Sequence, residues 1–145
     1  MMFLTARAEV TAKVILPALK EGKIVIADRF VDSTRAYQGG GRFDSDPGMI
    51  VRIDALNDFA IQRRWPDMTF YLDIDYETLM ARAPSGNLDY IERLGPEFYA
   101  RTIAEFERIA ATNPRVVKID GRRSRENIFT HDIKPQLDAL LANGV

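Results

Sequence analysis

Three short apolar segments, each ending in a carboxylate, constrain the fold of this chain more than any other feature. They occupy residues 23–28 (KIVIAD), 68–75 (MTFYLDID) and 115–120 (RVVKID). β-branched and aromatic residues dominate them, as is typical of parallel strands buried on both faces. Their terminal carboxylates, Asp28, Asp73 with Asp75, and Asp120, should lie at the carboxyl edge of a parallel sheet, where ligands bind in open α/β proteins.

Helical patterns alternate with these segments, because apolar residues recur every three or four positions between them. The expected helices cover residues 1–21, 48–60, 76–83, 98–109 and 124–141. Residues 29–47 contain three consecutive glycines, which predict mostly loop, and Pro135 predicts a kink in the last helix. Strands that alternate with helices indicate one α/β unit.

The charge balance narrows the classes of ligand. Lys and Arg total 20, Asp and Glu total 21, and the formal net charge is -1. Bulk charge therefore attracts neither nucleic acid nor an anionic membrane, and we expect neither as a partner. Arg outnumbers Lys by 15 to 5, and its planar fork suits small phosphorylated ligands. The chain has no Cys, which excludes thiolate chemistry and suits a cytoplasmic location.

One acid–base pair follows the first predicted strand. Asp28 and Arg29 precede Phe30, and Ser33, Thr34, Tyr37 and Gln38 follow within ten residues of Arg29. Arg29 can bind a phosphate through two hydrogen bonds, while Asp28 can hold that arginine or a hydrated Mg²⁺. The alternative is an exposed ion pair on the surface.

A series of motifs extends along the whole chain. They are F-x-x-x-R at 3–7, D-R-F at 28–30, S-T-R-A-Y-Q-G-G-G-R at 33–42, N-D-F-A at 57–60, P-D-M-T-F-Y-L-D-I-D at 66–75, D-Y-I-E at 89–92 and V-V-K-I-D at 116–120. In this order they resemble the thymidylate kinases, a family of P-loop nucleoside monophosphate kinases. The resemblance implies transfer of the γ-phosphate of ATP to dTMP, giving dTDP, with Mg²⁺ as the metal. It also implies a homodimer that pairs through its early helices.

The resemblance assigns the thymidine nucleotide to residues of the amino-terminal half. It implies that Phe3 stacks on the thymine ring and that Arg7 donates a hydrogen bond to thymine O4, which would reject cytosine. Thr34 and Gln38 would lie near the base edge. Tyr37 would pack under the sugar, where a 2′-hydroxyl would clash. Without the resemblance, Phe3 and Arg7 are equally well explained as neighbours on one helical face.

The resemblance assigns phosphate chemistry to a second set of residues. Arg29 would hold the dTMP phosphate, and Asp28 would shape the metal and phosphate region. Arg82 would stand where the family has an arginine of the lid that covers the ATP phosphates, and is the third catalytic candidate beside Arg29 and Asp28. Gly121 and Arg122 would lie against the adenine. A solvated loop is the alternative for the last two.

Two departures from the family pattern bear on activity. Residues 84–90 have Pro, Ser and Gly where relatives extend the lid with arginines. The sequence also has no G-x-x-x-x-G-K-[ST], the loop that holds ATP phosphates. The resemblance thus predicts one domain over residues 1–145, a partial three-layer α/β/α P-loop fold that lacks the central P-loop strand and is truncated at its amino terminus. We expect such a chain to be marginally stable or to rearrange its sheet.

Two other functions fit the same residues. A deoxynucleoside kinase also carries an acid–arginine pair after a strand, although S-T-R-A-Y-Q and the pair Phe3 and Arg7 favour the monophosphate kinase. A non-catalytic nucleotide-binding protein would bind dTMP without turnover of ATP. In the kinase interpretation, the chain supplies the acceptor-binding and lid portion.

Overall fold

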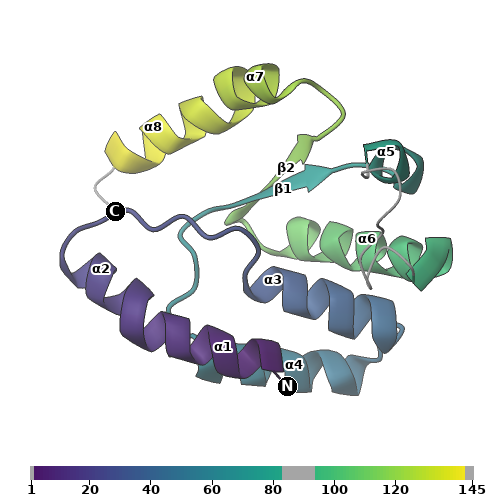
Figure 1. The fold of residues 1–145 in the computed structure, drawn as a ribbon, viewed down its shortest axis with the longest axis horizontal. Coiled ribbons are helices and arrows are strands. Elements are labelled where there is room, and N and C mark those ends of the chain that lie inside the picture. Colours follow the sequence, from purple (N-terminus) through teal and green to yellow (C-terminus); the bar gives the residue numbers. More distant parts are fainter. Residues whose placement is uncertain (1, 83–93, 143–145) are drawn as a thin grey trace. The chain divides into compact units, whose positions relative to one another are not determined.

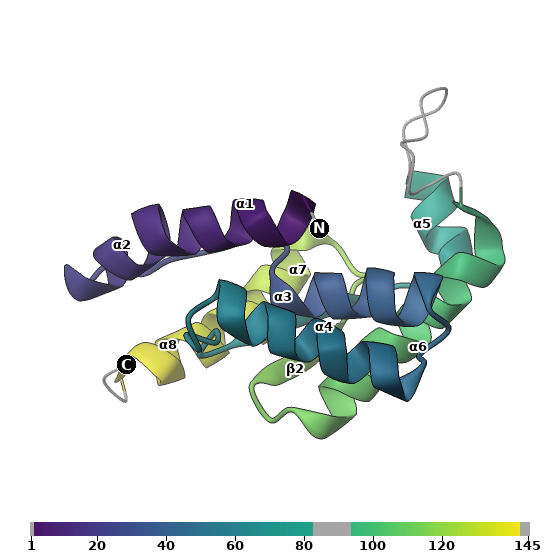
Figure 2. The same ribbon diagram turned by 90° about the horizontal axis from the view of Figure 1, so that it is seen from below.

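The computed structural model describes residues 2–82 and 94–142, which form a helix-rich α/β structure (Figures 1 and 2). The chain divides into two compact units. The first comprises Met1–Trp65 with Ala100–Glu107, and the second comprises Pro66–Tyr99 with Arg108–Val145. Each unit has buried apolar residues of its own.

Helices build the first unit. They are α1 (Met2–Val10), η1 (Thr11–Ile15), α2 (Leu16–Lys20), α3 (Val31–Thr34), η2 (Arg35–Arg42), α4 (Pro47–Ala60) and the middle of α6 (Gly95–Thr112). Asp46 caps α4 by accepting a hydrogen bond from the Met49 amide at 2.8 Å. α4 packs against α1, α3 and η2 (Figure 2). Its inward face buries Ile53, Asn57 and Ala60, so one helix organises this unit.

Two of the π-helical turns lie directly before helices that contain proline. η1 precedes α2, which contains Pro17, and η4 (Phe129–Ile133) precedes α8 (Lys134–Ala142), which contains Pro135. Proline lacks an N–H group and its ring clashes with the carbonyl four residues earlier. A widened turn relieves this clash; of the two positions, the sequence predicted a kink only at Pro135.

The expectation of loop over residues 29–47 was wrong for most of that segment. α3 and η2 are helical from Val31 to Arg42. The three glycines of η2 are buried. A Cβ on Gly39 would lie 2.4 Å from Ile50 Cδ1, so this glycine allows close packing against α4 rather than a turn.

The second unit contains the sheet. Its elements are β1 (Thr69–Asp73), α5 (Tyr76–Arg82), the two ends of α6 (Gly95–Thr112), β2 (Val116–Asp120), α7 (Arg125–Ile128), η4 and α8. β1 and β2 are parallel, with Thr69 opposite Val116 and Asp73 opposite Asp120. The carboxylates that end these two strands therefore lie at the same edge, as the sequence predicted.

The sheet of the described residues has two strands rather than the three that the sequence predicted. Residues 23–27 are assigned to no strand, and the Ile26 side chain is 89% exposed. A strand exists only where a neighbour completes its hydrogen-bond ladder. No described segment pairs with these residues, so their β-branched composition does not produce a strand here.

None of the helices that the structure describes has the length and apolar character needed to cross a membrane.

The exposed segment before α3 gives a first test by stability. Ile26→Ala should change the free energy of unfolding by less than about 0.5 kcal/mol, because the side chain lies in water. Ile61→Ala, at a fully buried site of the same unit, should cost about 2–5 kcal/mol. Urea denaturation of both variants measures the difference. Equal losses would mean that residues 23–28 are packed after all.

Candidate functional site

Arg7 is the centre of a hydrogen-bonded cluster in the first unit. It extends from α1, and its Nη1 donates to Thr34 Oγ1 at 2.6 Å and to Asn57 Oδ1 at 3.3 Å. Its Nη2 donates to the Phe30 carbonyl at 3.1 Å. Two residues that the family resemblance assigns to the thymine base, Arg7 and Thr34, are thus in direct contact.

The surroundings of Arg7 strengthen its interactions with polar partners. Burial lowers the pKa of Arg7, while the carboxylate of Asp32, itself buried, opposes that shift. The guanidinium also lies over the Phe30 ring, 5.4 Å from the ring centroid. A partly desolvated cation interacts more strongly with a carbonyl oxygen than a cation in water does.

Asn57 holds this cluster together, although the sequence predicted no role for it. Its side chain is only 1% exposed. Its Oδ1 accepts from Arg7, and its Nδ2 donates to the Val31 carbonyl at 3.2 Å. A signal was present in the sequence, because Asn57 lies on the same face of α4 as the apolar Ile53 and Ala60. A polar residue on an apolar face is bonded to something.

The contribution of Asn57 can be measured. Asn57→Ala leaves the Val31 carbonyl and one contact of Arg7 without their partner, so it should cost about 1–3 kcal/mol of unfolding free energy. Asn127→Ala replaces an exposed asparagine of α7 and should cost less than about 0.5 kcal/mol. Chemical denaturation measures both. A loss at Asn57 no larger than the loss at Asn127 would contradict the bonding pattern.

Arg29 and Tyr37 form a second contact in the same unit. Arg29 has a positive φ of 62°, a left-handed conformation that costs a non-glycine residue on the order of 1 kcal/mol and recurs at functional sites. Its guanidinium carbon lies 5.4 Å from the centroid of the Tyr37 ring. Asp28 and Arg29 are both exposed, so both side chains are accessible to a charged ligand.

Phe3 and Gln38 are the remaining residues that the resemblance places at the thymidine nucleotide. Phe3 lies on α1 one turn before Arg7, and its side chain is 68% exposed. Gln38 is half-buried in η2, where its backbone carbonyl accepts a hydrogen bond from the backbone amide of Phe43 at 3.1 Å. Tyr37 lies beside Gln38 in η2 and packs edge-on against Phe106, with 6.0 Å between ring centroids.

Asp28 was also the predicted metal ligand. Among residues 2–82 and 94–142, no three His, Cys, Asp or Glu side chains are gathered as they would be to hold a metal ion. Magnesium at nucleotide sites is bound through one or two carboxylates together with substrate phosphates and water. Asp28, a single exposed carboxylate beside Arg29, is suited to a site of that kind, in which phosphates and water supply the other ligands.

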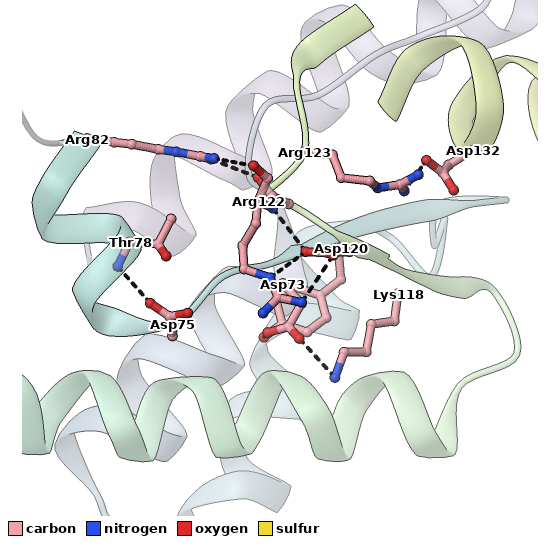
Figure 3. A network of polar contacts seen from close by, with 11 residues as sticks. Asp73, Asp75, Thr78, Arg82, Lys118, Asp120, Arg122, Arg123 and Asp132 are labelled. Carbon is pink, nitrogen blue, oxygen red and sulfur yellow. Dashed lines mark hydrogen bonds and ion pairs between the residues drawn. The ribbon is translucent and has the colours of Figure 1, made fainter. Parts of the chain in front are cut away.

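The carboxyl edge of the sheet carries a separate network in the second unit (Figure 3). Lys118 Nζ lies 3.0 Å from Asp73 Oδ2. Arg122 binds Asp120 with two nitrogens, Nε to Oδ1 at 2.8 Å and Nη2 to Oδ2 at 3.1 Å. These hydrogen bonds lower the pKa of Asp120 to about 2, so Asp120 is a carboxylate at neutral pH.

Arg82 reaches from α5 to the loop that follows β2 (Figure 3). Its Nη1 donates to the Gly121 carbonyl at 2.7 Å and its Nη2 to the Arg122 carbonyl at 2.8 Å. The three residues that the sequence assigned to ATP therefore contact one another. A Cβ on Gly121 would lie 2.8 Å from Ile74 Cγ2 and 3.1 Å from the Asp73 carbonyl, so the loop passes too close to β1 for a larger residue.

Known proteins are similar to this chain over most of its length. The family model for thymidylate kinase matches residues 1–131. The chain belongs to the thymidylate kinase family. The helices and the parallel β1–β2 pair form part of the P-loop kinase α/β fold. Residues 84–90, which the resemblance places in the lid, lie outside the part of the chain that the structure describes.

Three curated thymidylate kinases illustrate the relationship. The enzyme of Fervidobacterium nodosum is 41% identical over 134 residues, which cover 92% of this chain and 66% of the relative. That of Thermosipho africanus is 37% identical, with coverage of 89% and 62%. That of Photobacterium profundum is 39% identical, with coverage of 97% and 66%. The chain thus spans 62% to 66% of the length of these relatives.

Proposed function

We propose that residues 1–145 are a thymidylate kinase-like domain that supplies the acceptor-binding and lid portion of an enzyme that transfers the γ-phosphate of ATP to dTMP. The observation that carries this proposal is the cluster in which Arg7 contacts both Thr34 and Phe30. Its members come from motifs far apart in the sequence. The family membership of the chain supports the same reaction.

Arg7 would read the base in this proposal. A thymine O4 is an acceptor and can receive an N–H from the guanidinium, whereas cytosine offers an amino donor at that position. If the cytosine amino group faced the partly buried Arg7 guanidinium, neither donor would have an acceptor. This mismatch would strongly favour thymine over cytosine. Phe3 is exposed one turn away on α1, where its ring can stack on the base.

Arg29 would bind the phosphate of dTMP. Its exposure and its left-handed backbone suit a side chain that is held toward a ligand. Asp28 would hold Mg²⁺ together with phosphate oxygens, and that ion supplies neutralisation of phosphate charge when it is bound. Tyr37 would pack under the deoxyribose. In the second unit, Arg82, Gly121 and Arg122 would meet ATP.

The role of Arg29 can be tested with ligands that differ by one phosphate. Arg29→Ala should weaken dTMP binding by about 1.5–3 kcal/mol, the range of hydrogen bonds to charged groups, and should leave thymidine binding unchanged. Arg52→Ala, an exposed arginine of α4, is the control and should bind dTMP normally. Calorimetry of each variant with dTMP and thymidine decides the assignment. Unchanged dTMP affinity would rule out the phosphate contact, and tighter binding of thymidine than of dTMP by the unsubstituted chain would favour a deoxynucleoside kinase.

A homodimer through the early helices is the second part of the proposal. The exposed apolar residues of α1, η1 and α4 include Val10, Val14, Val51 and Phe59. α1 and α4 pack against each other, and Val10 and Val14 are one turn apart. Exposed apolar residues gathered on packed helices are typical of protein interfaces. A cytoplasmic location, consistent with the absence of Cys, completes the proposal.

Charge placed on this surface should separate the subunits. Phe59 is 81% exposed, so Phe59→Arg should leave the fold intact and weaken dimerisation about 100-fold, because a cation would be buried without a partner. Phe129→Arg, on an exposed phenylalanine of η4, should not alter assembly. Sedimentation velocity at several concentrations measures both. A Phe59→Arg variant that sediments like the unsubstituted chain would contradict the interface.

A further inference from the structure

A buried ionic cluster in the first unit has no part in the contacts described above. Glu105, in the middle of α6, is fully buried. Its Oε1 accepts from Arg35 Nε at 2.8 Å, and its Oε2 accepts from Ser45 Oγ at 3.0 Å. Arg35 Nη1 also donates to Asp54 Oδ2 at 2.8 Å. Both oxygens of the Glu105 carboxylate are therefore bonded.

A contribution to the free energy of unfolding does not by itself explain this buried ionic cluster. Taking a carboxylate out of water is costly, and apolar residues of similar size often stabilise a protein as well or better. Two acids share one arginine here, because Arg35 binds both Glu105 and Asp54. Burial raises the pKa of Asp54, although Arg35 opposes the shift. Such groups can instead select one conformation of the elements that they join.

Glu105 joins the start of η2 to the segment that follows its end. Arg35 is the first residue of η2, and Ser45 lies three residues after its end. In the middle, Gly40 packs on Glu105 so closely that a Cβ would lie 2.6 Å from Glu105 Cβ. Glu105 therefore contacts the first residue of η2, its centre and the chain just after its end.

Neighbouring residues of α6 hold the same segment. Arg101 donates from Nε and Nη2 to the Gly41 carbonyl at 3.1 and 3.0 Å. Phe106 packs edge-on against Tyr37. A π-helical turn is rare and is kept mostly at functional sites, so its geometry needs contacts of this kind from outside the segment.

We propose that Glu105 is a positioning residue that fixes the π-helical conformation of η2 and so places Tyr37 and Gln38 against the bound nucleotide. This inference rests on the proposed function, which puts Tyr37 under the deoxyribose. Glu105 acts through Arg35, Ser45 and Gly40 and does not touch the ligand. Its loss should therefore change which sugar is accepted, in addition to how tightly a nucleotide binds.

Glu105→Gln tests this inference, because it keeps the shape and removes the charge that Arg35 binds. Amide hydrogen exchange over residues 36–43 should accelerate about 10-fold, the factor expected for loss of one charge-assisted contact. The preference for dTMP over its 2′-hydroxyl counterpart should fall by a similar factor. Glu97→Gln, at an exposed position near the start of α6, should change neither quantity.

A combined variant separates positioning from stability. Arg35→Met and Glu105→Met, made together in an Asp54→Leu background so that no carboxylate loses its partner, replace the ionic cluster by apolar side chains and should recover unfolding free energy. The sugar preference should stay lost. Recovery of the preference together with stability would show a merely structural role and overturn the inference.

The exchange measurement also keeps this inference distinct from the proposed function. If the unsubstituted chain does not bind dTMP, the proposed function fails, and exchange over residues 36–43 still reports whether Glu105 fixes η2. Unchanged exchange in Glu105→Gln overturns the inference even if dTMP binds well. Faster exchange with an unchanged sugar preference overturns the link to Tyr37.

Discussion

The proposed acceptor region depends on the hydrogen bonds of one partly buried arginine. Arg7 ties α1 to Thr34 of α3 and to Asn57 of α4. A desolvated guanidinium needs acceptors in fixed positions, since an unpaired N–H in such a site is costly. Asn57 meets that need and at the same time binds the carbonyl of Val31. The positions of α1, α3 and α4 relative to one another therefore follow in part from satisfying a single side chain.

The same rule of satisfied backbone and side-chain groups explains which parts of the fold the sequence could predict. Residues 68–75 and 115–120 contain strands because each completes the ladder of the other, in a register that aligns Asp73 with Asp120. Residues 23–28 have an equally strand-like composition, yet they form none. Composition records a preference for extended backbone, whereas a strand requires a partner, and the choice of partner is not a local property.

The residues of the candidate site also differ in how readily the sequence predicts them. Arg7, Thr34, Arg29 and Tyr37 belong to motifs, and the structure brings them into contact in pairs. Asn57 begins the N-D-F-A motif and Glu105 belongs to none, but neither was predicted as a site residue, and their importance comes from segments 26 and 70 residues away. Sequence periodicity can show that a polar residue faces a core, but it cannot name the partner. The residues that support a site are therefore harder to predict than the residues that meet the ligand.

The way each arginine is held indicates what it can do. Arg7 and Arg82 donate to protein carbonyls, and Arg35 is bound by two carboxylates. Such contacts fix a side chain and leave it less able to move toward a ligand. Arg29 is exposed and rests against an aromatic ring, a contact that orients a cation without the strong directional bonds of a carboxylate. A phosphate can therefore displace solvent from Arg29 without breaking an ion pair. In the proposed function, Arg7 and Arg82 therefore meet their ligands from fixed positions, whereas Arg29 is free to move onto a phosphate.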